Sequence, residues 1–139
     1  SYNEANSISK SKGLGISKQS WNLVPKINEL DQIMQIKIRP QIYESHPELC
    51  FQTMNEDELR FSKKENLGIK ERKKILIKNG FDRKFLNKNL KKNKNYHPDD
   101  FLDACALSWT AKRVINQQNL NLPEDPEKDE LGIIMQIKI

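Results

Sequence analysis

The 139-residue sequence predicts a helix-rich α/β fold with few strands. Residues 17–34, 47–54 and 98–116 either repeat apolar side chains at helical steps or open with a proline that suits a first helical turn. Residues 41–45 and 131–139 hold β-forming or alternating side chains, as short strands do. Only 36% of the residues are apolar and 31% are charged, so we expect a lean domain or part of a larger one.

The N-terminal region combines a polar lead-in with the first predicted helix. Residues 1–16 are rich in Ser, Asn and Gly, which predicts a flexible segment. Ser17 is a favourable N-cap for the helix that follows, in which apolar residues recur every three or four positions. Pro25 interrupts this pattern, so we expect a kink, or a short helix followed by a longer one.

The middle of the chain predicts two further helices. Pro47 suits the first turn of a helix over residues 47–54. After a polar connector, a basic helix is expected over residues 68–78. Residues 81–96 are ambiguous, because a few apolar side chains there can seed a helix within a strongly basic stretch.

The strongest predicted helix covers residues 98–116. Pro98 presets its first turn, and Asp99 and Asp100 interact favourably with the positive end of the helix dipole. A loop rich in Pro, Asp and Glu follows over residues 119–130, before the alternating C-terminal stretch.

The hexapeptide IMQIKI occurs twice, at residues 33–38 and 134–139. No longer repeat surrounds the two copies, so coincidence is the favoured interpretation. The hexapeptide is apolar enough to pair at an exposed strand edge. We therefore predict that the chain forms a homo-oligomer through edges at residues 134–139 or 41–44.

The formal charge of +5 is unevenly distributed along the chain. Residues 60–94 contain 14 basic and 3 acidic residues, a net charge of +11, between two mildly acidic regions. Such a segment binds phosphate backbones through counterion release, so nucleic acid is a predicted partner. The alternative is a solvated surface, because few aromatic side chains are present for base stacking. The lysines predicted to make this contact are Lys84, Lys88, Lys91 and Lys92.

Composition excludes several classes of protein. No run of 18 apolar residues exists, so the sequence predicts no membrane-spanning helix. The opening stretch lacks the apolar segment of a secretion signal. Cys50 and Cys105 lie in apolar contexts without a CxxC spacing, which predicts reduced core thiols in a cytoplasmic protein.

Three carboxylates are candidate metal ligands. Asp100 and Asp103 are three residues apart and share a helical face, and Asp103 lies on the stripe expected to be buried. A buried carboxylate needs a cation, a hydrogen-bond donor or a metal. Glu44 ends the predicted strand, and oxygen ligands on rigid elements suit Mg²⁺. The alternative is a capped helix start with a salt bridge, which explains Asp99 and Asp100 well and Asp103 less well.

Two histidines each precede a proline. His46 stands before Pro47 and is held extended near the N-cap of the next helix, where a cap, a core residue and a proton shuttle are all open roles. His97 stands before Pro98 in the same arrangement and is interpreted as a helix entry. Their separation matches no zinc motif.

Three phrases occur in an order that resembles a known family. They are GLGISKQSWNLVPKINELD at residues 13–31, YESHPELCF at residues 43–51 followed by SKK at residues 62–64, and DDFLDACALSWTAKRV at residues 99–114. Together they resemble the family called domain of unknown function 429 (DUF429), also described as predicted RNase H-like nucleases. The DDFLDACA phrase is also similar to the last-helix acidic motif of RuvC-type resolvases.

The resemblance implies an RNase H-like fold and metal-dependent phosphodiester hydrolysis. On that basis the predicted catalytic residues and ligands of Mg²⁺ or Mn²⁺ are Glu44, Asp100 and Asp103. Lys63 and Lys64 are predicted to contact phosphate. Members of the family begin with a strand that carries an Asp-Gly phrase and supplies a principal metal ligand, and no such phrase occurs here.

We therefore expect residues 17–139 to be the C-terminal part of an RNase H-like domain, incomplete and helix-rich, after the flexible residues 1–16. As a nuclease this chain is predicted to be weak or inactive, because the first-strand aspartate is missing. The alternative is a non-catalytic nucleic-acid-binding module that uses residues 60–94. A truncated product or a helical partner-binding protein is a third prediction.

Overall fold

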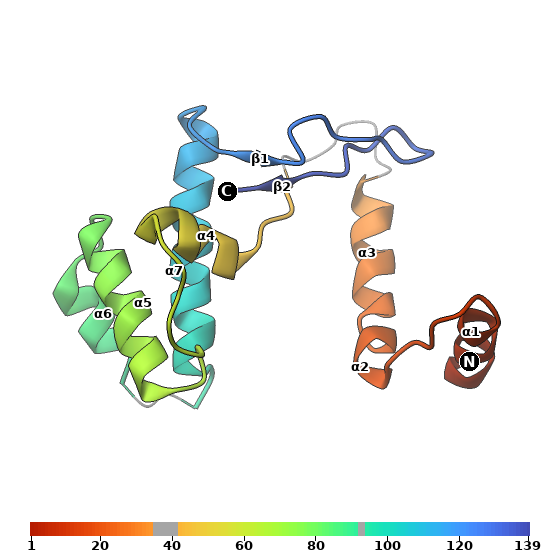
Figure 1. Cartoon of the computed structure of the whole chain (residues 1–139), viewed down its shortest axis with the longest axis horizontal. Coiled ribbons are helices and arrows are strands. Elements are labelled where there is room, and N and C mark those ends of the chain that lie inside the picture. The colour runs from red at the N-terminus through yellow and green to blue at the C-terminus, as the bar shows by residue number, and fades with distance from the viewer. Residues whose placement is uncertain (35–41, 92–93) are drawn as a thin grey trace. The chain divides into compact units, whose positions relative to one another are not determined.

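The computed structural model describes residues 1–34, 42–91 and 94–139 of the chain. These residues contain seven helices and two short strands (Figure 1), which confirms the predicted helix-rich α/β composition. The chain divides into two compact units, Ser1–Ile42 and Tyr43–Ile139.

The first unit begins with a helix where the sequence predicts a flexible segment. Helix α1 spans Tyr2–Ser11. It is stabilised by a capping box, in which the Ser1 Oγ accepts from the Glu4 N–H and the Glu4 carboxylate accepts from the Ser1 amino group at 2.6 Å. The Asn6 Oδ1 accepts from the Ile16 N–H at 2.9 Å and ties the following residues back to the helix.

Two more helices of the first unit match the prediction. Helix α2 spans Lys18–Trp21, and the Ser17 Oγ caps it by accepting from the Ser20 N–H at 2.9 Å. Helix α3 spans Val24–Met34, with Pro25 as its second residue. The predicted short helix followed by a longer one is therefore confirmed, because a proline fits a first turn where the missing N–H costs nothing.

The first unit buries little apolar surface. None of the residues of α1, α2 and α3 is buried. Leu23, Ile27 and Leu30 are 52%, 59% and 45% exposed. The unit therefore has no hydrophobic core of its own among the described residues.

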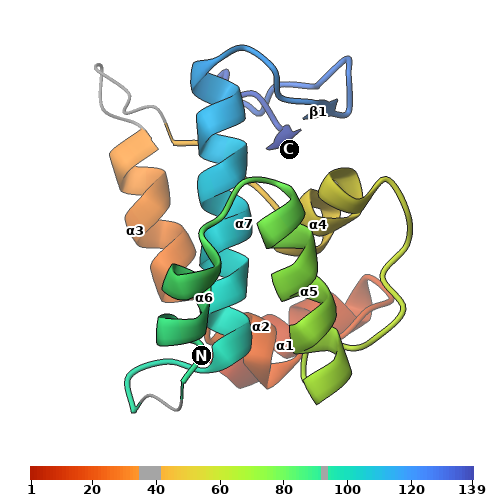
Figure 2. The same cartoon turned by 90° about the vertical axis from the view of Figure 1, so that its left-hand side faces the viewer.

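The core of the second unit lies between three helices. Helix α4 spans Pro47–Asn55, α5 spans Asn66–Lys78 and α7 spans Pro98–Ile115, close to the predicted bounds. Helix α7 packs against both α4 and α5, as Figures 1 and 2 show from two sides. The buried apolar residues are Cys50, Phe51, Met54, Ile75, Leu76, Leu86, Leu102, Cys105, Ala106 and Ile139.

The ambiguous basic stretch forms helix α6, Arg83–Asn89. The Asp82 carboxylate caps it by accepting from the Phe85 N–H at 2.7 Å. Leu86 is fully buried and anchors this short helix to the core. Phe85 adds a second apolar contact, with its ring centroid 5.7 Å from that of Phe101, to a helix that is otherwise rich in Lys and Asn.

The strands are shorter than the sequence predicts. Strands β1, Asn121–Leu122, and β2, Ile137–Lys138, form an antiparallel two-stranded sheet. The prediction of a strand over residues 41–45 is wrong for the described residues 42–45. These residues form no strand, and only Glu44 makes an isolated bridge, to Ile137. Residue 41 lies outside the described residues. The RNase H-like arrangement of strands stays a prediction.

Strand β2 is not a free edge. It pairs with β1 on one side, and on the other the Lys138 N–H donates to the Glu44 carbonyl at 2.8 Å. Ile139 is buried, and its N–H and carbonyl both bond to Leu120. Residues 137–139 therefore offer no free strand edge, because their backbone groups are already paired, and the homo-oligomer stays a prediction. Most of the first IMQIKI copy, residues 35–38, lies outside the described residues.

Both cysteines are buried and unpaired, as predicted. The Thr110 hydroxyl lies 3.1 Å from the Cys50 Sγ, to which it donates a hydrogen bond. Burial raises the pKa of the Cys105 thiol to about 11, because the thiolate loses its solvation. In the described part of the chain, no helix is both long and apolar enough to cross a membrane.

Candidate functional site

Residues 60–64, here called the anchored loop, are held against helix α5 by hydrogen bonds to their backbone. The two carboxylate oxygens of Glu71 accept from the Arg60 N–H at 3.0 Å and the Phe61 N–H at 3.2 Å. The Arg72 Nη1 donates to the Phe61 carbonyl at 3.0 Å. Two consecutive residues of α5 thus fix the path of the loop that precedes it.

Gly68 allows the anchored loop to lie directly on α5. A Cβ at this position would lie 1.9 Å from the Ser62 carbonyl oxygen and 3.1 Å from the Arg72 Nη1. No side chain fits at 1.9 Å, so the close approach of two backbones requires glycine here. This explains why glycine, which has poor helix propensity, stands at this position of α5.

The anchored loop brings two lysines to the first turns of α7. The Lys63 Nζ lies 2.7 Å from the Asp103 Oδ2, and the Lys64 ammonium pairs with Asp99. Asp99 and Asp103 are four residues apart and share one face of α7. Their side chains are only 7% and 17% exposed, so each buried carboxylate has a cation beside it.

Pairing changes the titration of the Asp99–Lys64 pair. The hydrogen bond from Lys64 is the main reason why the pKa of Asp99 lies below its usual value, and burial opposes this effect. The same bond to Asp99 raises the pKa of the Lys64 ammonium. Both groups therefore stay charged across neutral pH.

A buried arginine links α4 to α5 in the same region. Arg72 is 2% exposed, and its Nη2 lies 2.6 Å from the Glu48 Oε2. Its guanidinium also lies over the Phe51 ring, 5.6 Å from the centroid, and donates to the Gly68 carbonyl at 3.2 Å. Glu48, which belongs to the YESHPELCF phrase, is therefore the ionic partner of this arginine.

Several buried atoms of this cluster keep unused hydrogen-bonding capacity. The Asp103 Oδ1, the Glu48 Oε1 and the Arg72 Nε are buried and have no hydrogen-bond partner among the described residues. Buried polar atoms usually have a hydrogen-bond partner, so these three atoms can form hydrogen bonds with a ligand or with water. Glu48 and Arg72 also line an open hollow, whose other lining residues are Gln52, Leu59, Arg60, Phe61, Ser62 and Lys63.

The predicted metal ligands have different surroundings. Asp100 is exposed, and its Oδ2 accepts from the His97 N–H at 3.1 Å, which makes it a helix cap. Glu44 is exposed and bridges to β2. Asp103 pairs with Lys63.

These carboxylates are not gathered into one group in the part of the chain that is described, and their role as metal ligands stays a prediction. No three His, Cys, Asp or Glu side chains gather there in a way that would hold one ion. Lysines neutralise Asp99 and Asp103 as well. The described donor set therefore does not fit a divalent ion without further ligands.

Most of the predicted nucleic-acid-binding lysines are exposed. Lys84, Lys88 and Lys91 are exposed, whereas Lys92 lies outside the described residues. Lys63 and Lys64 differ from these lysines, because each forms a salt bridge with an aspartate of α7. Further exposed cations of α5 and α6, outside the predicted set, are Lys70, Lys74, Lys78 and Arg83.

Three residues of the cluster were not predicted from the sequence. Asp99 was explained as a cap, although its spacing of four from Asp103 places both on one helical face. Gly68, the first residue of the predicted helix and the third of α5, was the available signal for a close backbone approach. Arg72 resembles every other cation of a basic helix, and no sequence signal distinguishes it.

The fold and the site define a helix-rich α/β unit whose acidic helix start is paired with a basic loop. Comparison with known families places the chain: it belongs to the family described as Protein of unknown function (DUF429), whose model matches residues 1–128. The predicted family is therefore confirmed. No match was found among curated proteins or among solved structures. Nuclease activity and the likeness to RuvC-type resolvases stay predictions.

Proposed function

We propose that this DUF429 chain binds the phosphate backbone of nucleic acid through the lysines of α5 and α6. The observation that carries the proposal is their spacing. Lys70, Lys74 and Lys78 follow one another at four-residue steps along α5, and Lys84 and Lys88 do the same along α6. Residues four apart lie on one side of a helix, so each helix presents a row of exposed ammonium groups.

These rows have an energetic cost that a polyanion offsets. None of the five lysines forms a salt bridge within the described residues, so their charges are not neutralised by the chain itself. Like charges at this spacing destabilise a helix by about 0.2–0.5 kcal/mol per pair. A phosphate backbone replaces that repulsion with attraction and releases counterions.

A charge-matched comparison tests the proposal. Four lysines are changed to Gln in the basic rows, and four exposed lysines of the first unit are changed in the control. The test set is Lys70, Lys74, Lys84 and Lys88, and the control set is Lys10, Lys12, Lys18 and Lys26. Fluorescence anisotropy with a labelled DNA or RNA strand measures the affinity of each whole chain.

The two variants carry the same net charge and differ only in where charge was removed. We expect the test variant to lose at least about tenfold in affinity and the control to lose much less, because only one set contacts phosphate. Equal losses in both variants would mean that net charge alone drives binding, and the proposal would be abandoned.

Metal-dependent hydrolysis of phosphodiester bonds is the second candidate. The unpartnered, buried Asp103 Oδ1 favours it, because a carboxylate oxygen without a donor among the described residues is a ready ligand for a cation. Two observations argue against a complete metal site. Asp103 already pairs with Lys63, and the described residues bring no group of three potential ligands together. We therefore propose at most weak cleavage by this chain, and the family-derived ligands Glu44, Asp100 and Asp103 would need further ligands to hold the ion.

Cleavage assays with Mg²⁺ and with Mn²⁺ test this second candidate. Single- and double-stranded DNA and RNA are incubated with the chain and with an Asp103→Asn variant that is purified in the same way. Weak cleavage that disappears in the variant supports hydrolysis at this site. Cleavage that survives the substitution comes from elsewhere or from a contaminant.

A further inference from the structure

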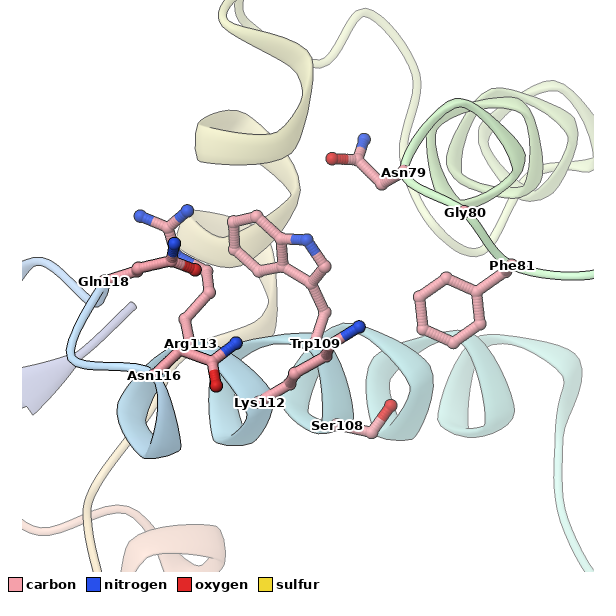
Figure 3. Close-up of a pocket in the computed structure, with 9 residues that line it drawn as sticks. All are labelled: Asn79, Gly80, Phe81, Ser108, Trp109, Lys112, Arg113, Asn116 and Gln118. Atoms are coloured by element: carbon pink, nitrogen blue, oxygen red, sulfur yellow. The ribbon is translucent and has the colours of Figure 1, made fainter.

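A second cavity lies away from the anchored loop, between the end of α5 and the second half of α7. It has a volume of about 370 Å³, within the range of small-molecule sites. Figure 3 shows its lining, with Trp109 at the centre. The residues that line it are Asn79, Gly80, Phe81, Ser108, Trp109, Lys112, Arg113, Asn116 and Gln118.

The cavity exists because the chain turns sharply after α5. The Phe81 N–H donates to the Leu76 carbonyl, and Gly80 has a φ of +93°, a backbone conformation that favours glycine. Asn79 also holds this turn in place, because its Nδ2 donates to the carbonyls of Met54 in α4 and Ile75 in α5.

The charge of the lining is positive and unopposed. Lys112 and Arg113 are its ionisable residues, and no Asp or Glu lines it among the described residues. Neither cation forms a salt bridge within the described residues, and the buried Arg113 Nε has no hydrogen-bond partner there. Such donors bind an anion, and two cations outweigh the weak opposing dipole at the end of α7.

The lining also offers aromatic surface beside these charges. The Arg113 guanidinium lies over the Trp109 ring, 4.5 Å from its centroid, and Phe81 contributes a second ring. A planar base stacks on such surfaces. The side-chain amides of Asn116 and Gln118 supply donors and acceptors that match base edges, whereas the amide group of Asn79 already donates to two backbone carbonyls.

We propose that this cavity binds one nucleotide unit, with its base against Trp109 and its phosphate on Lys112 and Arg113. The ligand is either a free nucleotide or the phosphorylated end of a strand. The inference rests on the proposed function only for the second source. The two cations lie on a different helix from the lysine rows of α5 and α6, so the two sites can be tested separately.

Tryptophan fluorescence gives a direct readout, because the chain has two tryptophans and one of them is Trp21. In a Trp21→Phe background, Trp109 is the only indole. Adenosine monophosphate, adenosine, inorganic phosphate and a short strand with or without a 5′-phosphate are titrated into the whole chain. Saturable quenching by the monophosphate is expected, with at least about tenfold weaker binding of adenosine or phosphate alone.

Two substitutions and one control locate the binding. Lys112→Gln and Arg113→Gln are each expected to lower the affinity for the monophosphate by about tenfold, since each removes a charged hydrogen bond. Lys26→Gln in the first unit, which lowers the net charge equally, is expected to leave the affinity for the monophosphate unchanged. Circular dichroism confirms that each variant is folded.

The outcomes separate this proposal from the proposed function. Quenching by the monophosphate that is lost in the Lys112 and Arg113 variants supports the cavity, even if the lysine rows prove not to bind nucleic acid. Quenching only by the 5′-phosphorylated strand supports the cavity as a strand-end site. No saturable quenching by either ligand, or quenching that is equal in all variants, overturns the proposal.

Discussion

Replacing Gly68 by alanine tests how the anchored loop is held. In an exposed helix interior this change stabilises a protein by about 1 kcal/mol, because alanine has the better helix propensity. Here the new Cβ would lie 1.9 Å from the Ser62 carbonyl oxygen, whereas ordinary contacts begin at 3.4 Å. Loop and helix must therefore separate by about 1.5 Å, which follows from these two distances.

The separation acts on several interactions at once. It lengthens the bond from Arg72 to the Phe61 carbonyl and the bond from the Glu65 N–H to the Ser62 carbonyl, each 3.0 Å at present. Overpacking of this kind costs about 1–3 kcal/mol, and each broken hydrogen bond adds about 1 kcal/mol. After the gain in propensity, we expect Gly68→Ala to lower the free energy of unfolding by about 2 kcal/mol.

Urea unfolding followed by circular dichroism measures this change. Lys70→Ala, at an exposed position of the same helix, is the control and is expected to lie within about 0.5 kcal/mol of the wild type. The reasoning also predicts coupling: Asp103→Asn should cost less in the Gly68→Ala background, because the displaced loop no longer delivers Lys63. A Gly68→Ala variant that is more stable than the wild type would refute the close approach.

Three further predictions concern the ionic cluster and the core. Asp99→Asn is expected to lower stability by about 1 kcal/mol at neutral pH, because Lys64 loses its charged partner. Since the folded-state pKa of Asp99 lies below its ordinary 3.8, this contribution is present above that pH and disappears as the pH falls through the folded value, which urea unfolding at several pH values checks. Arg72→Met is expected to cost about 2–4 kcal/mol, because it leaves the partly buried Glu48 without a cation; thermal unfolding measures the loss, and a shift no larger than that of an exposed Lys→Met change would contradict it. With a pKa of about 11, Cys105 should be alkylated by iodoacetamide at about pH 8 far more slowly than a free thiol and should react fast only in denaturant; rapid labelling of the native chain would show that this thiol is not buried.

The sequence predicted the helices of the second unit well, and local reasons explain this. Pro47 and Pro98 each open a helix at the expected place, and in the first unit Pro25 lies in the first turn of α3, which follows the short helix α2. Helix α1 was not predicted, because the polar composition of its residues outweighed the capping-box spacing of Ser1 and Glu4.

The strands and the carboxylate cluster were predicted less well. Short strands depend on partners far away in the chain, and the bridge between Glu44 and Ile137 has no local sequence signal. Helical spacing correctly placed Asp103 on a partly buried face. The same reasoning missed Asp99, because capping explained an acidic first turn without any need for burial.

The salt dependence of nucleic-acid binding tests the central claim most directly. The affinity of the whole chain for a labelled strand is measured over a range of salt concentrations, for the wild type and for the variant with Lys70, Lys74, Lys84 and Lys88 changed to Gln. If these lysines bind phosphates, the slope of log affinity against log salt should become shallower by about 0.7–0.9 for each lysine that no longer neutralises a phosphate, a total of about 3. An unchanged slope with the four lysines removed would contradict the account.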